Sequence, residues 1–171
     1  KMMGIETHFQ IIPYRGEYYR LAAKHNRLVN HLIYPIPDPE LPFLGIHLTR
    51  MIDGSITVGP NAVQGFKREG YDRFNFNMKD CLEMSFFPGF WRVTFRYLKT
   101  GLSELHSSWF EASYLKKVNK YCPKIELEDL ECYPAGVRAQ AVLDDGTLVH
   151  DFLFAESERS LHVCNAPSPA A

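Results

Sequence analysis

Apolar and polar side chains alternate along two short runs, residues 46–52 and 55–58, that flank the dipeptide Asp53-Gly54. Both runs are rich in β-branched residues, which favour strands. An Asp-Gly pair between such runs is the strongest short-range signal for a β-hairpin, because both residues of a two-residue turn must accept positive φ. The pattern therefore predicts a tight antiparallel hairpin.

The two-residue turn predicts a register in which Arg50 lies opposite Thr57 and His47 opposite Pro60. Because side chains alternate along a strand, His47 and Arg50 are predicted to point to opposite faces of the sheet. Unless a bulge intervenes, only one of the two can face a given pocket.

A second Asp-Gly pair, at 145–146, predicts a second hairpin with arms 135–143 and 147–154. Its register places Arg138 opposite Leu153. The neighbours of Arg138 in the first arm are small, so its guanidinium can lie in a crevice. There it would pair either with a carboxylate of the protein or with an anionic ligand.

Closer to the N-terminus, residues 9–14 and 17–22 form two strand-like runs around Arg15-Gly16. A glycine at such a place indicates either a bulge or the close approach of a ligand to the backbone. Taken by itself, Tyr18 in the second run is an ordinary strand aromatic that packs across a sheet.

The middle of the chain has helical periodicity. Asn77 reads as an N-cap, apolar residues in 90–98 recur at i, i+4 and i+7, and a further helix is predicted over 102–122. Aromatic residues at helical spacing usually belong to a core, so Trp91 and Trp109 are predicted to be buried. The fold class is therefore α+β, a mainly antiparallel sheet covered on one face by helices.

Composition narrows the function classes. With 171 residues the chain is predicted to form one domain with one core. The 19 basic and 20 acidic residues leave a net charge of −1, which offers no field to attract nucleic acid. The four cysteines show no CxxC pair, which favours reduced thiols in the cytoplasm, and the seven histidines never fall at HxH or HExxH spacing. No apolar run is long enough to span a bilayer, but peripheral contact with the inner membrane stays open.

Four motifs in order carry a resemblance to a known family. They are IIPYRGEYYRLA at 11–22, PIPDPELPFLGIHLTR followed by VGPNA within 35–62, AGVRAQAV at 135–142 and CNAPSPAA at 164–171. Together they resemble the FAD-dependent L-2-hydroxyglutarate oxidases and dehydrogenases, which belong to the D-amino-acid oxidase and glycerol-3-phosphate dehydrogenase superfamily.

The resemblance implies a substrate-binding domain over residues 1–171, because the GxGxxG turn that holds the ADP part of FAD in this family is absent from the sequence. The chain also stops at Ala171, inside the family's C-terminal flavin loop. We therefore expect a fragment that neither holds FAD nor is active alone, while the full-length enzyme is a flavoprotein.

The family also implies roles for individual residues. Its Gly-Val/Leu-Arg motif makes Arg138 the clamp for a substrate carboxylate, although many relatives have proline after this arginine and this chain has alanine. Tyr18 stands where glycerol-3-phosphate relatives have a substrate-contacting histidine, and it is expected to donate a hydrogen bond. His47 is the expected catalytic base or hydroxyl partner, since its ordinary pKa is near neutrality. Arg50 or Arg15 is expected to bind the second carboxylate. The alternative for His47 is a histidine satisfied within the sheet.

Asn165 and Ser168 lie in the C-terminal motif and are the expected flavin contacts. The expected partners are a small dicarboxylate substrate and, through the full-length enzyme, oxygen or a membrane quinone as electron acceptor, with no nucleic acid. Two alternatives stay open. One is a related flavoenzyme for another 2-hydroxy acid, an amino acid or glycerol 3-phosphate, and the other is a binding domain without catalysis.

Overall fold

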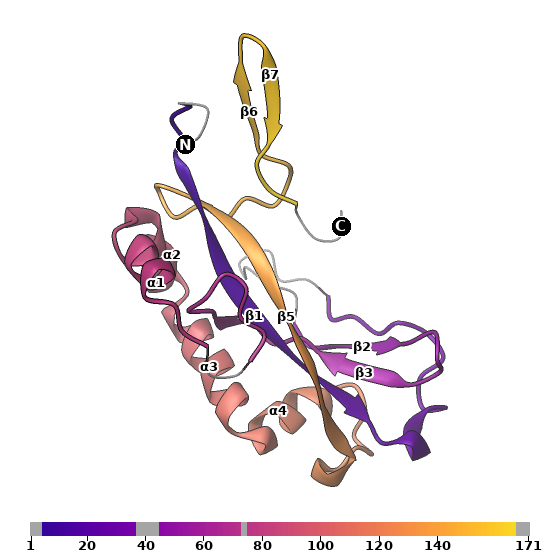
Figure 1. Ribbon diagram of the computed structural model, residues 1–171. Coiled ribbons are helices and arrows are strands. Elements are labelled where there is room, and N and C mark those ends of the chain that lie inside the picture. Colours follow the sequence, from indigo (N-terminus) through magenta and orange to yellow (C-terminus); the bar gives the residue numbers. More distant parts are fainter. Residues whose placement is uncertain (1–4, 37–44, 73–74, 167–171) are drawn as a thin grey trace. The chain divides into compact units, whose positions relative to one another are not determined.

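A computed structural model describes residues 5–36, 45–72 and 75–166 of the chain. The fold is α+β with an antiparallel sheet, as predicted (Figure 1). The strands that the model describes are β1 (Phe9–Leu21), β2 (His47–Arg50), β3 (Ile56–Gly59), β4 (Val63–Gln64), β5 (Leu130–Leu143), β6 (Phe154–Ser157) and β7 (Ser160–Val163). The α-helices are α1 (Met78–Ser85), α2 (Pro88–Arg96), α3 (Leu98–Trp109) and α4 (Glu111–Val118).

Two strands are long, and they organise the sheet. β1 and β5 have 13 and 14 residues and pair with each other. On the other side of β1 the order continues through β3 to β2, with antiparallel pairing in both steps. β6 and β7 form a separate two-stranded hairpin.

The chain divides into two compact units. Unit 1 contains Lys1–Tyr14, Gly65–Leu98 and Val137–Ala171, and unit 2 contains Arg15–Gln64 and Lys99–Gly136. β1 and β5 each contribute residues to both. Every unit has its own hydrophobic cluster, so the prediction of one core was wrong.

The core of unit 2 lies between three strands and α4. Its strand side contains a row of three paired residues, Tyr19, Val58 and Leu48, which we call the core row. The Tyr19 ring meets the ring of Tyr114 edge-on, with 4.7 Å between the centroids. Val118, one helical turn after Tyr114, is also fully buried, so α4 covers this face of the strands.

The core of unit 1 is smaller. Its buried members are Ile12, Met84, Phe87, Val93, Val142 and Leu148. The predicted N-cap of its first helix is confirmed, because the side chain of Asn77 accepts a hydrogen bond from the backbone N–H of Asp80 at 3.0 Å. Pro88 then starts α2 at its first position, where the missing N–H costs nothing.

The first hairpin forms as predicted, but its register is shifted by one residue. His47 pairs with Gly59 instead of Pro60. The loop has three residues, with Gly54 at φ 82°, and the Asp53 carboxylate accepts the backbone N–H of Ser55 at 2.9 Å. This local bond favours a turn that ends in a left-handed glycine over a two-residue turn with two positive φ angles.

The second hairpin shows the same shift. Gly146 has φ 81°, and the Asp145 carboxylate accepts the N–H of Thr147 at 2.8 Å. Val142 then pairs with Leu148, which is one residue away from the predicted register. The predicted second arm is also too long, because residues 150–153 lie in no strand.

The helical middle differs from the prediction in two ways. The single helix predicted over 102–122 is broken at Phe110 into α3 and α4. Trp91 and Trp109 are 45% and 58% exposed, so the prediction that they are buried was wrong. α3 turns a polar face inward, so that the neighbouring Ser108 is buried. Trp109 is exposed for this reason. None of the helices in the described ranges is long and apolar enough to cross a membrane.

Candidate functional site

The sheet of unit 2 places Tyr18 and His47 on the same face. The core row points toward α4, and neighbouring residues along a strand point the other way. His47 pairs with Gly59, and Tyr18 precedes Tyr19 of the core row. Tyr18, Gly59 and His47 therefore form a second row on the opposite face, which we call the Tyr18–His47 row.

Gly59 is the middle of this row, and only glycine fits there. Its φ is 135°, and a Cβ would lie 2.7 Å from the carbonyl oxygen of Glu17, 2.9 Å from the Tyr114 hydroxyl and 3.1 Å from Cδ1 of Tyr18. The Tyr18 ring also lies 3.9 Å from the position of a Cβ on Gly136 of β5. The glycine at position 59 thus makes room for the phenol ring, whereas a side chain at position 136 would be in ordinary contact with it.

His47 is half-buried and held by two contacts. Its ring stacks on Tyr34, with centroids 4.5 Å apart, and its Nδ1 lies 3.3 Å from the carbonyl oxygen of Gly45. When Nδ1 carries the proton and donates to that carbonyl, Nε2 is left as the acceptor. This arrangement suits a proton acceptor.

Arg50 lies on the other face from His47, as the alternation predicted. The β2–β3 register runs without a bulge, so Arg50 shares the side of Leu48. Its Nη1 lies 3.2 Å from the carbonyl oxygen of Val29, to which it donates. The structure does not bring Arg50 together with His47.

Arg15 also lies on the core side of β1, two and four residues before Glu17 and Tyr19. It forms an ion pair with the Glu17 carboxylate, and the two side chains are only 8% and 12% exposed. The neighbouring Gly16 does make a close approach, but within unit 2 it is to Pro60, whose Cβ lies 2.6 Å from the position of a Cβ on Gly16.

Glu17 is the hub of a buried polar cluster that the sequence reasoning missed. Its carboxylate accepts from Asn61 Nδ2 at 2.7 Å and from Ser108 Oγ at 2.8 Å. Its backbone N–H donates to Asn61 Oδ1 at 2.8 Å, and the Tyr114 hydroxyl donates to its carbonyl oxygen at 3.3 Å. Burial holds the pKa of Tyr114 well above its usual value, so this phenol remains a donor. No local pattern in the sequence indicated this cluster, because Asn61 and Ser108 lie 44 and 91 positions away from Glu17.

Arg138 and Asn165 both belong to unit 1 and border the same space. They line a small cavity of about 40 Å³, roughly the room for one water molecule. The Asn165 side chain accepts from the N–H of Leu153 at 2.7 Å and donates to the carbonyl oxygen of Asp151 at 3.0 Å. Its amide thus holds a loop of the protein. Ser168 lies outside the described residues.

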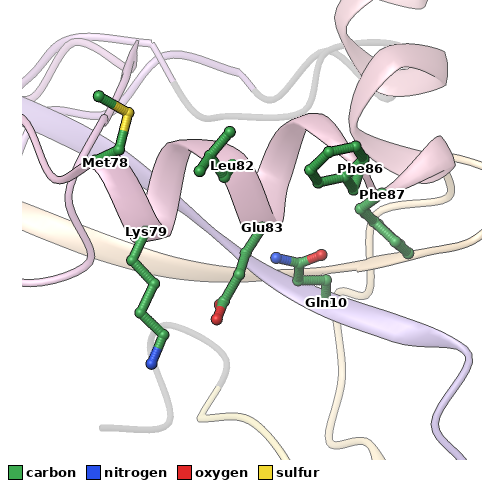
Figure 2. Close-up of a pocket in the computed structure, with 7 residues that line it drawn as sticks. All are labelled: Gln10, Met78, Lys79, Leu82, Glu83, Phe86 and Phe87. Atoms are coloured by element: carbon green, nitrogen blue, oxygen red, sulfur yellow. The ribbon is translucent and has the colours of Figure 1, made fainter.

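A much larger hollow of about 640 Å³ lies along α1 and the start of β1 (Figure 2). It is lined by Gln10, Met78, Lys79, Leu82, Glu83, Phe86 and Phe87. Figure 2 shows Lys79 and Glu83 extending from the same side of α1. None of the predicted site residues that the structure describes lines this hollow, and its walls are mainly apolar.

The described residues do not form a cradle for the ADP part of a flavin. The amide of Asn165 is engaged with the loop, and no glycine-rich turn precedes a helix in residues 5–36, 45–72 or 75–166. Within the same ranges, no three His, Cys, Asp or Glu side chains converge to hold a metal ion.

Comparison with known proteins gives consistent matches. A family model described as FAD dependent oxidoreductase matches residues 1–170. The chain is 59% identical over 171 residues to L-2-hydroxyglutarate dehydrogenase of Escherichia coli strain K12, covering 100% of this chain and 40% of that protein. It is 43% identical over 176 residues to the mitochondrial L-2-hydroxyglutarate dehydrogenase of Mus musculus, covering 100% of this chain and 38% of that protein. The chain thus spans about two fifths of the length of these relatives.

Proposed function

Because the chain belongs to the family of FAD-dependent oxidoreductases, we propose that it is the substrate-binding part of an enzyme that oxidises L-2-hydroxyglutarate to 2-oxoglutarate. In this proposal, the mainly antiparallel sheet with helices on one face is the substrate-binding domain of a D-amino-acid-oxidase-like flavoenzyme. The FAD-binding domain belongs to the remaining part of the full-length enzyme.

The observation that carries the proposal is the Tyr18–His47 row. A 2-hydroxy acid must lose a proton from its hydroxyl group and a hydride from the same carbon. His47 Nε2 accepts the hydroxyl proton in our proposal, because Nδ1 already faces the carbonyl oxygen of Gly45. The Tyr18 phenol donates a hydrogen bond to the substrate. FAD, when bound to the full-length enzyme, supplies the hydride acceptor.

Arg138 is the proposed clamp for one carboxylate. Its side chain is exposed and borders a polar cavity, and a guanidinium fork can bind a carboxylate through two parallel hydrogen bonds. We do not assign the second carboxylate to Arg15 or Arg50, since both lie on the face of the strands that also carries the core row.

The proposed setting of the full-length enzyme is the cytoplasm, with oxygen or a membrane quinone as electron acceptor. A quinone acceptor would require peripheral contact with the membrane. The isolated chain lacks a hydride acceptor and is expected to be inactive.

The test uses the full-length flavin-loaded enzyme under anaerobic conditions. L-2-Hydroxyglutarate should bleach the flavin absorbance, whereas D-2-hydroxyglutarate and glycerol 3-phosphate should not. Arg138→Lys should lower kcat/KM by about 100-fold, because lysine cannot bind a carboxylate bidentately. Bleaching by a different substrate would overturn the assigned specificity, and a full-length protein without flavin would overturn the reaction.

A further inference from the structure

The Glu17 carboxylate accepts hydrogen bonds from two further side chains in addition to its ion pair with Arg15. The carboxylate is 12% exposed and receives hydrogen bonds from Asn61 and Ser108 besides its ion pair with Arg15. Asn61 and Ser108 are themselves buried, with exposures of 3% and 5%. These partners come from a loop after β3 and from the end of α3, so one carboxylate joins three separate segments of unit 2.

The bond between Glu17 and Asn61 is reciprocal. Asn61 donates from its amide nitrogen to the Glu17 carboxylate and accepts the Glu17 backbone N–H with its amide oxygen. The Asn61 backbone N–H also points to the carbonyl oxygen of Glu17, at 3.4 Å. The loop at 59–61 is therefore fixed against β1 from both its side chain and its main chain.

This fixation acts on the middle of the Tyr18–His47 row. Gly59 is two residues before Asn61, and its α-carbon packs against the Glu17 carbonyl so closely that a Cβ would lie 2.7 Å away. Tyr114 ties the same place together, because its hydroxyl donates to the carbonyl oxygens of Val58 and Glu17 at 3.1 and 3.3 Å. A shift of this loop would move the backbone on which the Tyr18 ring lies.

We propose that Glu17 is a positioning residue for the reaction. Its buried carboxylate holds Asn61, and through it Gly59, so that Tyr18 and His47 face the substrate in a fixed arrangement. Glu17 does not touch the substrate, because it lies on the opposite side of β1 from Tyr18. This inference rests on the proposed function, since it concerns the same row of residues.

The chemistry requires a carboxylate and not an amide at this position. A carboxylate only accepts hydrogen bonds, which matches three donors, Arg15, Asn61 and Ser108. In Glu17→Gln the new NH₂ group would face one of these donors, and the buried guanidinium of Arg15 would lose its counter-charge. The loop at 59–61 is then no longer held.

The experiment uses the full-length flavin-loaded enzyme and follows the flavin spectrum while 2-oxoglutarate is added. We expect Glu17→Gln to raise the Kd of 2-oxoglutarate at least tenfold and to lower kcat with L-2-hydroxyglutarate. The double variant Glu17→Gln with Asn61→Asp should recover most of the loss. It restores one negative charge to the cluster and reverses the direction of the hydrogen bond between side chains 17 and 61.

Asp129→Asn is the matched control. The Asp129 side chain is 2% exposed in the same unit and forms an ion pair with Lys24 at 2.6 Å. Loss of this ion pair should lower the Tm but leave the Kd of 2-oxoglutarate within twofold of that of the unchanged enzyme. If Glu17→Gln lowers the Tm in the same way and also leaves Kd and kcat within twofold, Glu17 is only structural and the proposal is overturned.

Ser108→Ala keeps the test decisive if Glu17→Gln does not fold. It removes one donor from the carboxylate and keeps the ion pair, and we expect it to raise the Kd about threefold. A Kd equal to that of the unchanged enzyme would overturn the proposal. The unchanged enzyme is assayed first, so a different substrate preference would count against the proposed function alone. The variants would then be titrated with the product of that substrate.

Discussion

Two carboxylates in unit 2, Glu17 and Asp129, are both largely enclosed, with side chains 12% and 2% exposed, but they fix different parts of the chain. Glu17 accepts hydrogen bonds from Asn61 and Ser108, 44 and 91 positions away, and the bond from Asn61 holds the segment that follows Gly59. Asp129 accepts the backbone N–H of Glu126, three residues away, forms an ion pair with Lys24 and lies 3.0 Å from Nε2 of His25. The role of a buried charge is therefore decided by the segment that it immobilises and not by its burial.

The largest expected effect concerns the row that Glu17 supports. His47→Asn should lower kcat of the full-length enzyme by roughly 10²- to 10⁴-fold, because this is the usual contribution of a general base. Substrate binding and Tm should change little, since the His47 ring is half-buried and stacks on an exposed tyrosine. Single-turnover flavin reduction measures the step directly. Reduction at an unchanged rate would show that His47 is a histidine satisfied within the sheet.

Gly59→Ala should break the same region through its backbone. The new Cβ would meet the Glu17 carbonyl and the Tyr114 hydroxyl below 3.0 Å, at a φ of 135° that side chains rarely adopt. We expect a loss of about 2–4 kcal/mol in the free energy of unfolding, from strain and forced displacement. Urea denaturation of the full-length enzyme would measure it. A loss below about 0.5 kcal/mol would mean that the loop at 59–61 is not fixed against β1.

Features that depend on a local sequence pattern could be predicted from the sequence. Both Asp-Gly hairpins and the N-cap at Asn77 were found, and so was the placement of His47 and Arg50 on opposite faces. The register of each hairpin was missed by one residue. The aspartate of each pair bonds to the N–H two residues later, and this choice between turn types depends on a few hydrogen bonds.

The Glu17 cluster could not be predicted from local pattern, because its partners are distant in the sequence. Nothing in the run from 17 to 22 indicates that Asn61 and Ser108 converge on the same carboxylate. The prediction of which face of α3 is buried was wrong for the same reason. A helix that turns buried serines toward a polar cluster leaves its leucines and Trp109 exposed, which contradicts the hydrophobic pattern.

The contribution of the second carboxylate, Asp129, to stability should depend on pH. The ammonium of Lys24 and the N–H of Glu126 lower the pKa of Asp129 to about 2 from an ordinary 3.8. Because the folded pKa is the lower one, this contribution is fully present above about pH 4 and is lost as the pH falls toward 2. The urea midpoint of the unchanged enzyme should exceed that of Asp129→Asn at pH 5, and the gap should narrow by pH 2.5. A gap that is equal at both pH values would show that Asp129 contributes through packing alone.

The smallest expected effect comes from a glycine that supports neither carboxylate. Gly101 lies inside α3, and a Cβ built on it meets no heavy atom within 4 Å. Glycine in a helix interior costs roughly 0.5–1 kcal/mol relative to alanine, because the unfolded chain loses more conformational freedom. Gly101→Ala should therefore raise the free energy of unfolding by about that amount, opposite in sign to Gly59→Ala. Both substitutions add one methyl group, so only the local backbone and its neighbours can account for the difference. A destabilised Gly101→Ala variant of the full-length enzyme would mean that another part of the enzyme packs against α3 at this position.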